Sequence, residues 1–318
     1  MQAPGTGGNS VPVLITWDVD PDLWIPFERR QPALSAAMDM CHNLNIRATF
    51  FFTAQPASTY AREIEKMQAQ GHEIGCHGLT HGNEEDYDRM PQATQRAYIK
   101  EATEKLQTVV GGPIRAFRSP RVKTSACALK LLTEYSYQAD SSICSQRIDF
   151  VSSNMVNTNW ILAPRQPYHP HQASAFKRGD VPIWEIPVSA MIAPFISSTM
   201  KVLGLPFMKG FFRLLHAESR LTGKPIVYLA HPSEFASGKQ EKKTSQGRHA
   251  RCVRKYFKRK YFSPSYIRTH GLRLRTILYR LDAETLLDST RELFSYMASF
   301  ADVEFMTVSE YVAHLDPS

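Results

Sequence analysis

The sequence predicts an α/β fold, a distorted (β/α)7-8 barrel that forms a single domain within its 318 residues. Short apolar segments alternate with longer amphipathic segments along most of the chain, which is typical of parallel strands connected by helices. Seven or eight such units favour a closed or nearly closed barrel over an open sheet. Polar residues able to do chemistry follow several of the apolar segments, as they do at the active end of such barrels.

The predicted strands are short runs of apolar, β-branched and aromatic residues, the types most enriched in strands. The first run is continuously apolar until Asp18, and the second reads RATFFF. We expect strands at residues 11–17, 47–52, 73–76, 116–118, 138–140, 182–187, 226–230 and 303–306.

The predicted helices lie between these strands, where apolar residues recur at a helical spacing. Gly71 follows one helix and Gly111 another, in the position where glycine commonly ends a helix. Pro91 stands where a helix can begin, because the missing N–H of proline has no helical partner there. We expect helices at residues 32–42, 58–70, 91–110, 125–134, 207–221 and 283–299.

The expected domain covers residues 11–313, after a flexible N-terminal lead at residues 1–10. Two segments interrupt the regular alternation. One, at about 151–180, is rich in proline, asparagine and histidine, and the other, at about 237–280, is rich in lysine and arginine. We interpret both as irregular insertions over one rim of the barrel rather than as separate domains.

Composition excludes several classes of protein. With 43% hydrophobic and 21% charged residues the chain can bury a large core, so it is not a disordered protein. Its five cysteines are an odd number without a CxxC pair, which favours free thiols over a disulfide framework. Neither a signal peptide nor a membrane-spanning run is apparent, so we expect a cytoplasmic protein. The net charge of +8 favours an anionic partner without identifying it.

Two pairs of residues suggest a metal site. Asp18 and Asp20 end the first strand at i and i+2, so both point to one side, where two carboxylates are costly unless a cation or a proton lies between them. His77 and His81 stand four residues apart, and two imidazoles at this spacing can bind one ion. The alternatives are an aspartate-rich turn for the first pair and two surface histidines for the second.

Five segments together resemble the motifs of polysaccharide deacetylases, the NodB-homology or carbohydrate esterase 4 group. They stand in the family's order over about residues 11–232, at 16–20 (TWDVD), 71–81 (GHEIGCHGLTH), 117–121 (FRSPR), 137–140 (YQAD) and 228–232 (YLAHP). The closing segment 305–311 (FMTVSEY) also looks like the last strand and helix of such domains. The resemblance implies a distorted (β/α) barrel and the hydrolysis of an N-acyl group.

The resemblance also implies a role for each matched residue. Asp20, His77 and His81 would hold Zn²⁺ or a similar divalent ion, with Co²⁺, Ni²⁺ or Mn²⁺ as alternatives. Asp18 would be the general base, oriented by Arg118. His231 would be the general acid, with its imidazole held by Asp140. Such roles suit amide hydrolysis near neutral pH, where the water must lose a proton and the departing amine must gain one.

The chain departs from the family pattern in three places. The usual first motif has two adjacent acids and a glycine, whereas Asp-Val-Asp is typical of a divergent branch that includes deformylases of lipid-linked aminosugars and relatives of allantoinase. The usual aromatic residue of the third motif is Arg121, which could bind a phosphate or carboxylate of the substrate or be a surface residue. The fourth-motif tryptophan is replaced by Ser-Ser-Ile at positions 141–143. Trp24, shortly after the first strand, is a second candidate for substrate binding.

Three further segments have a functional and a structural interpretation. Residues 168–171 (YHPH) could form a second metal site, although a loop flanked by proline is more often structural. Residues 191–220 could be an interfacial helix or a barrel helix with one buried face, and residues 251–260 (RCVRKYFKRK) a phosphate-binding or a solvated loop. The functional interpretations would allow a polyprenyl-phosphate-linked sugar at an anionic membrane surface.

From these observations the sequence predicts a metal-dependent hydrolase that removes an acetyl or formyl group from the nitrogen of an aminosugar, which could be lipid- or nucleotide-linked. The alternatives are the same chemistry on a small amide or ureide that is not a sugar, as in allantoinase, and a non-catalytic carbohydrate- or nucleic-acid-binding module. We expect an N-acylated sugar as substrate and no nucleic-acid partner. The sequence leaves the oligomeric state and a peripheral position at the inner membrane face open.

Overall fold

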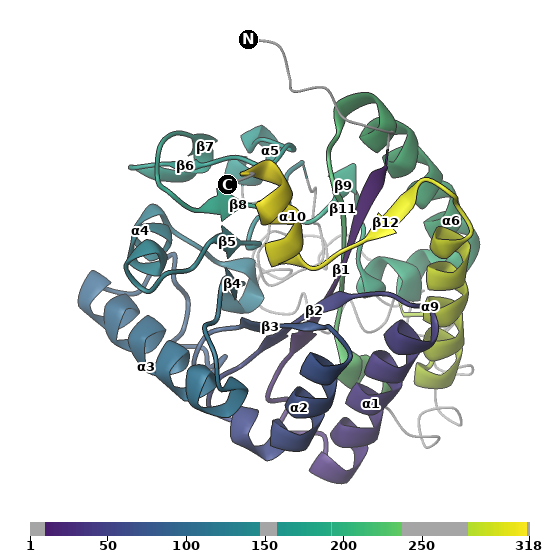
Figure 1. Ribbon diagram of the computed structural model, residues 1–318, viewed down its shortest axis with the longest axis horizontal. Helices are drawn as coiled ribbons and strands as arrows, with labels where there is room; N and C mark the ends of the chain where they lie inside the picture. Colours follow the sequence, from purple (N-terminus) through teal and green to yellow (C-terminus); the bar gives the residue numbers. More distant parts are fainter. Residues whose placement is uncertain (1–9, 147–157, 192, 237–278, 317–318) are drawn as a thin grey trace, which may run out of the picture.

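Eight parallel strands form one curved sheet, an incomplete barrel, in the computed structural model (Figure 1), which describes residues 10–146, 158–191, 193–236 and 279–316. Their order is β11-β1-β2-β3-β4-β5-β8, and β12 pairs with the start of β1. This architecture confirms the predicted distorted (β/α) barrel. The strands are β1 (Val11–Val19), β2 (Ala48–Phe52), β3 (Glu73–Cys76), β4 (Ala116–Phe117), β5 (Ala139–Asp140), β8 (Trp184–Glu185), β11 (Ile226–Ala230) and β12 (Val303–Phe305).

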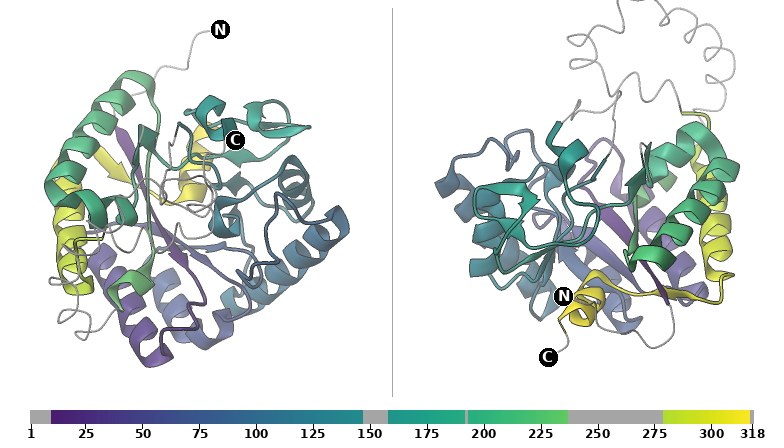
Figure 2. Two further views of the ribbon diagram at one scale, coloured as in Figure 1. Left: turned by 180° about the vertical axis from the view of Figure 1, so that it is seen from behind. Right: turned by 90° about the horizontal axis from the view of Figure 1, so that it is seen from above.

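Helices cover the outer side of the curved sheet, as the view along the barrel and the view from above both show (Figures 1 and 2). They are α1 (Phe27–Asn43), α2 (Ala61–Ala69), α3 (Gln92–Val110), α4 (Ala126–Glu134), α6 (Ser197–Thr222) and α9 (Ala283–Ala298). Helix α10 (Val308–Leu315) instead lies over one end of the barrel and packs against its inner side (Figure 1). Several start or end at the residues that the sequence suggests. Gly111 ends α3 with a φ of 72°, and the Ser125 side chain accepts a hydrogen bond from the first turn of α4.

Two helices are longer than predicted. Helix α1 begins at Phe27, five residues before Pro32, so the proline that was expected to start the helix lies inside it. Helix α6 begins at Ser197, ten residues before the expected start. Gly204, with φ 81° and ψ 171°, separates a first short piece from the rest of α6 and so interrupts the helical periodicity of the sequence. Helix α6 packs against α9 and β11, as expected of a barrel helix.

The first predicted insertion is more regular than expected. Its described part contains α5 (Thr158–Leu162) and a hairpin of β6 (Pro170–His171) and β7 (Ser174–Arg178), so interpreting this part as irregular was wrong. The hairpin is closed by backbone hydrogen bonds that its composition does not reveal. Nearly all of the second insertion, residues 237–278, lies outside the described residues, as does the expected N-terminal lead to residue 9.

Strand β1 is buried at all nine positions and carries the site on its inner face. Val13, Ile15 and Trp17 pack in the larger cluster under the helices, whereas Leu14 belongs to a second cluster inside the barrel. Because side chains alternate along a strand, Thr16 and Asp18 face the interior with Leu14. The burial of β1 on both faces explains its continuous apolar sequence.

The barrel is joined between β8 and β11 by the segment that follows β8. Ser189 donates its backbone N–H to the carbonyl of Val227 at 3.1 Å, and its hydroxyl accepts the Val227 N–H at 3.0 Å. A short pair of strands, β9 (Ala190–Met191) and β10 (Ala193–Pro194), comes next. The Ser189 hydroxyl therefore accepts a hydrogen bond that a backbone carbonyl would accept between two paired strands.

His72, directly before β3, is a structural histidine. Its Nδ1 accepts the backbone N–H of Ala48 at 3.2 Å, and burial, with a smaller contribution from His42, lowers the pKa of His72 to about 4. In the unfolded chain His72 binds a proton below about pH 6.5, whereas in the folded protein it does so only below about pH 4. Stability from this residue is complete above pH 6.5 and declines as the pH falls.

Replacing His72 with asparagine, which keeps an acceptor, is expected to remove this pH dependence. Between pH 8 and pH 5 the wild type should lose about 2 kcal/mol more free energy of unfolding than His72→Asn, measured by urea unfolding with a chelator present. The exposed His314, changed to asparagine, serves as control and should behave as wild type. Equal losses in wild type and His72→Asn would refute the assignment.

Candidate metal centre and catalytic site

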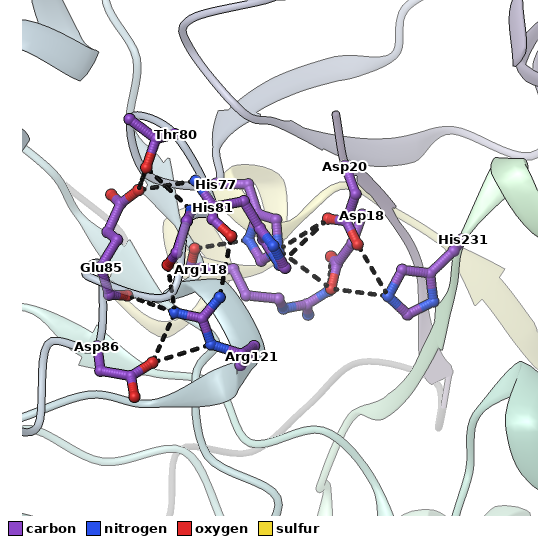
Figure 3. Close-up of polar contacts among 11 residues, drawn as sticks. Asp18, Asp20, His77, Thr80, His81, Glu85, Asp86, Arg118, Arg121 and His231 are labelled. Atoms are coloured by element: carbon purple, nitrogen blue, oxygen red, sulfur yellow. Dashed lines mark hydrogen bonds and ion pairs between the residues drawn. The ribbon is translucent and has the colours of Figure 1, made fainter. Parts of the chain in front are cut away.

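The side chains that the sequence singled out meet at the carboxyl ends of the parallel strands (Figure 3). Asp18 is the second-last residue of β1 and Asp20 follows that strand; His77 follows β3, and His231 follows β11. Carboxyl ends of parallel strands lie at one end of the barrel, so residues more than two hundred positions apart become neighbours.

Asp20, His77 and His81 form a compact group of three possible metal ligands. The Oδ1 of Asp20 lies 3.3 Å from the His77 Nε2 and 3.5 Å from the His81 Nε2. One ligand atom from each residue lies within 4.8 Å of the other two, and no other group in the described part of the chain meets this criterion. Histidine nitrogen with carboxylate oxygen is a donor set that suits Zn²⁺ and similar divalent ions.

The protonation pattern of this group fits a cation. The Nδ1–H of His77 donates to the carbonyl of Arg118 at 2.8 Å, which leaves the Nε2 lone pair directed at Asp20. The Oδ1 of Asp20 is buried and accepts no hydrogen bond. A buried carboxylate oxygen this close to an imidazole nitrogen is unfavourable unless a positive charge, either a ring proton or a metal ion, lies between them, so the residues present fit a divalent metal.

The pKa values of the group are coupled. Burial would raise the pKa of Asp20, but His81, His77 and His231 together hold it far below its usual range. For His77 burial would lower the pKa, yet the charges of Asp18 and Asp20 raise it. Burial lowers the pKa of His81 even though Asp20 opposes the shift. Asp20 thus carries its negative charge at any working pH, as a ligand must.

Arg118 fixes the carboxylate of Asp18. Fully buried, it donates from Nη1 to the Asp18 Oδ1 at 2.8 Å and to the Thr16 hydroxyl at 2.9 Å. Its Nε and Nη2 donate to the carbonyl and hydroxyl of Ser141, each at 2.8 Å, and its guanidinium lies over the Phe51 ring. The other oxygen of Asp18 faces the three possible metal ligands and lies 3.8 Å from the His77 Nε2. The predicted contact between Arg118 and Asp18 is therefore present.

His231 lies on the opposite side of the two aspartates from His77, and its side chain is 30% exposed (Figure 3). Its Nε2 is 3.8 Å from the Asp20 Oδ2 and 4.0 Å from the Asp18 Oδ2, and among the described residues these are the carboxylates within 4 Å. The expectation that Asp140 holds His231 is therefore wrong. Asp140 is directed elsewhere because it ends β5, where it faces Ser142 and the neighbouring strand β8.

Asp140 and Glu185 form a fully buried pair of acids on adjacent strands. Asp140 accepts the Ser142 hydroxyl at 2.6 Å and Glu185 the backbone N–H of Ile143 at 3.0 Å, while one oxygen of each acid lacks a hydrogen-bond partner. Burial raises the pKa of Asp140 to about 6 and, with the charge of Asp140, that of Glu185 well above its usual range. The two acids therefore share a proton near neutral pH.

The side chain of Arg121 faces the loop that carries His81. Its guanidinium binds Asp86 at 2.6 and 2.9 Å and donates to the carbonyls of His81, Gly82 and Glu85. The reason is its backbone: with φ at 56°, Arg121 lies in the left-handed region and turns its side chain toward the His81 loop. This placement shows that Arg121 is not a solvated surface residue, and its role in substrate binding stays a prediction.

Trp24 lies in the segment that joins β1 to α1, four residues after Asp20. Its side chain is 81% exposed, as is that of the neighbouring Leu23. Exposed aromatic surface this large is available to a ligand. Its predicted role in substrate binding stays a prediction.

Several residues of the site were not assigned a role from the sequence. Glu85, which is fully buried, and Asp86 hold the His81 loop, and Thr16 supports Arg118. Asp22 is buried beside Asp20, and burial together with that charge raises its pKa. The sequence feature that could have pointed to Glu85 and Asp86 is the acidic run Glu84–Glu85–Asp86 after the histidine motif. Such a run is more often a solvated turn.

The competing candidates are structural. His169 contacts the carbonyl of Ile183 at 3.0 Å, and the Nδ1 of His171 accepts the N–H of Ala173 at 3.1 Å, so neither belongs to a ligand group of the described residues. Cys76 is fully buried in the core, where burial raises the pKa of its thiol to about 12. Cys252 lies outside the described residues.

No helix within the described ranges combines the length and apolar character that crossing a membrane requires. Helix α6 nevertheless exposes four large apolar side chains, Leu203, Phe207, Leu214 and Leu221. Residues 251–260, the basic segment, lie outside the described residues.

Comparisons with known proteins point to one family. The profile described as "Polysaccharide deacetylase" matches residues 7–139. YheN of Bacillus subtilis (strain 168), a candidate polysaccharide deacetylase, is 21% identical over 192 residues, which is 59% of this chain and 66%, just under two thirds, of YheN.

Solved structures share the fold. A candidate polysaccharide deacetylase from Mycobacterium smegmatis superposes with a TM-score of 0.62 and 17% identity, over 100% of this chain and 93% of its own. PuuE allantoinase superposes with a TM-score of 0.60 and 15% identity, over 98% and 92%. At these identities the superpositions establish the common architecture.

Proposed function

We propose that this chain is a hydrolase of the polysaccharide deacetylase family that removes an N-acyl group, acetyl or formyl, from an aminosugar. One observation carries the proposal. The two imidazoles and the orphaned oxygen of Asp20 converge on one point, with a second carboxylate, Asp18, held beside them. A structural metal site has no need of that additional, separately oriented carboxylate.

Asp20, His77 and His81 would hold the cation, with Zn²⁺ as the first choice and Co²⁺, Ni²⁺ or Mn²⁺ as alternatives. When bound, such an ion supplies Lewis-acid polarisation of the acyl carbonyl and makes water easier to deprotonate. The remaining steps belong to residues of the chain.

Asp18 is the proposed base. One of its oxygens is bound to Arg118, so the other stays directed at the site and can take a proton from water. His231 is the proposed acid, because its side chain is partly exposed and its Nε2 faces the same space, where it can give a proton to the departing amine. The carboxylates of Asp18 and Asp20 lie within 4 Å of that nitrogen.

The test is release of acetate or formate from a panel of N-acylated aminosugars presented free, nucleotide-linked and polyprenyl-phosphate-linked. We expect turnover of at least one member by protein loaded with Zn²⁺ or Co²⁺ and none by protein treated with chelator. The linked members test whether the substrate is lipid- or nucleotide-bound, and addition of anionic vesicles tests a membrane-surface substrate. No release from any N-acylated sugar would reject the proposal.

A second candidate is the same chemistry on a small ureide or amide. The Asp-Val-Asp spacing and the superposition on PuuE allantoinase over 98% of the chain favour it. Allantoin and linear ureides therefore belong in the same panel, and exclusive turnover of these would select this alternative. The expected cytoplasmic location stays a prediction.

A further inference from the structure

The loop that carries His81, from Gly78 to Gly82, lies outside the strands and helices. His81 has a φ of 58°, in the left-handed region that only a few per cent of residues other than glycine adopt, although asparagine, aspartate and histidine do so more often than the rest. Such backbone persists only where its surroundings determine it, at a cost on the order of 1–3 kcal/mol. The neighbours of this loop must therefore supply what the secondary structure does not.

Glu85 binds the loop from one side. Its carboxylate accepts the backbone N–H groups of Leu79, Thr80 and His81 at 2.7, 2.7 and 2.8 Å. The Tyr87 hydroxyl donates to the same carboxylate at 3.0 Å. Gly78 makes room for it, since a Cβ there would lie 2.5 Å from the Glu85 Oε1. Three consecutive N–H groups thus point at a single buried anion.

Arg121 binds the loop from the other side. Its Nη1 donates to the His81 carbonyl at 2.9 Å, and its Nη2 donates to the carbonyls of Gly82 and Glu85 at 2.7 and 3.1 Å. Asp86 fixes the guanidinium in a two-point contact and is itself bound by Lys123 at 2.6 Å. Figure 3 shows this arginine and Glu85 on either side of the loop.

We propose that Glu85 and Arg121 are positioning residues that hold the imidazole of His81 in ligand geometry, with one binding the donors of the loop and the other its acceptors. The inference rests on the proposed metal site. The His81 ring lies 3.5 Å from the Asp20 Oδ1 and next to the His77 ring, which are members of the ligand group itself, and its backbone is fixed through both N–H and carbonyl. Outer residues of this kind typically change metal affinity 10- to 100-fold.

Arg121 offers the sharper test because its charge and its geometry predict opposite results. Removal of a cation near a metal site should strengthen metal binding if charge alone mattered. Loss of positioning should weaken it. Lysine keeps the charge but cannot reproduce the planar fork that reaches several carbonyls at once, so Arg121→Lys should also bind metal more weakly.

The experiment measures Co²⁺ binding by chelator competition and by visible absorption for wild type, Arg121→Gln, Arg121→Lys and Glu85→Gln. We expect the Kd for Co²⁺ to rise about 10- to 100-fold in all three variants, with a changed absorption spectrum. The matched control is Arg165→Gln, since Arg165 is 21% exposed and binds Glu218 much as Arg121 at 17% binds Asp86. It should bind Co²⁺ as wild type does.

The outcomes separate the two proposals. Wild type that binds no Co²⁺ would overturn the metal site itself. Wild type that binds Co²⁺, with Arg121→Gln and Arg121→Lys within twofold of its Kd and unchanged in spectrum, would overturn the positioning role alone. If Arg121→Gln does not fold, Arg121→Lys decides by the same criterion.

Discussion

Asp18→Asn is expected to lower kcat about a thousandfold while the protein still binds its metal, because a positioned base typically contributes 10²- to 10⁴-fold. Asparagine has the shape of aspartate and can still accept the Arg118 hydrogen bond, at 2.8 Å in the wild type, through its carbonyl oxygen. It cannot take a proton from water. The metal ligands Asp20, His77 and His81 are unchanged, so Co²⁺ affinity should stay within a few fold.

The measurement combines turnover of the best substrate with Co²⁺ binding and thermal unfolding. Thermal unfolding is needed because Arg118 is fully buried and loses its counterion in this variant, which destabilises proteins. The control is Asp302→Asn, which changes an aspartate that likewise contacts a histidine, His216 at 2.9 Å, and should keep full activity. Full activity of Asp18→Asn would remove Asp18 from the mechanism.

His77→Ala is expected to abolish both turnover and stoichiometric metal binding. His77 is almost fully buried, its Nδ1 is bound to the Arg118 carbonyl and its Nε2 points at Asp20, so its removal leaves two of the three proposed ligands. The Kd for Co²⁺ should rise by more than the roughly 100-fold that loss of an outer residue causes. Isothermal titration and metal analysis of the purified variant measure this loss.

A matched variant separates loss of a ligand from loss of a buried side chain. His216 on α6 is also buried and also contacts an aspartate, yet it lies on a helix outside the proposed site. His216→Ala should therefore lose stability and keep its metal. If His77→Ala bound one equivalent of Co²⁺ with the affinity of wild type, the ligand set proposed here would have to be abandoned.

The sequence predicted the strands well where burial on both faces leaves a continuous apolar run. Residues 73–76 and 226–230 match β3 and β11 at both ends, and β1 extends two residues further than the expected 11–17. Strands of two residues, such as β4, offer too little pattern to delimit, so their predicted ranges were too long. Periodicity likewise missed the first part of α6, since Gly204 interrupts it.

The candidate site was predictable as far as its ligands stand in local motifs. His77 with His81, and Asp18 with Asp20, are close in sequence, and the end of a strand explains why they meet. Contacts across strands were not predictable, since a single sequence does not reveal register. The family resemblance assigned Asp140 to His231, and the register that makes Glu185, on the adjacent strand, the neighbour of Asp140 could not be read from the sequence to correct it.

Arg121 shows a different limit. Its side-chain direction follows from a backbone φ of 56°, in a turn where Val122 also has a positive φ of 51°. Nothing in the residue types of this turn predicts a left-handed conformation, and for a β-branched residue it is an outlier. The sequence around Arg121 therefore could not show whether its side chain is buried or exposed.

The strand that carries Asp18 is paired over a greater length than the strands next to Arg118 and Asp140. Strand β1, nine residues long, is bonded to three other strands, whereas β4, which precedes Arg118, and β5, which ends at Asp140, are two residues each. Fluctuations open a fold first where pairing is shortest. During local unfolding of the native state, the amide hydrogens of β1 near Asp18 would therefore exchange last. A partly unfolded molecule would keep this carboxylate in place and could refold around it.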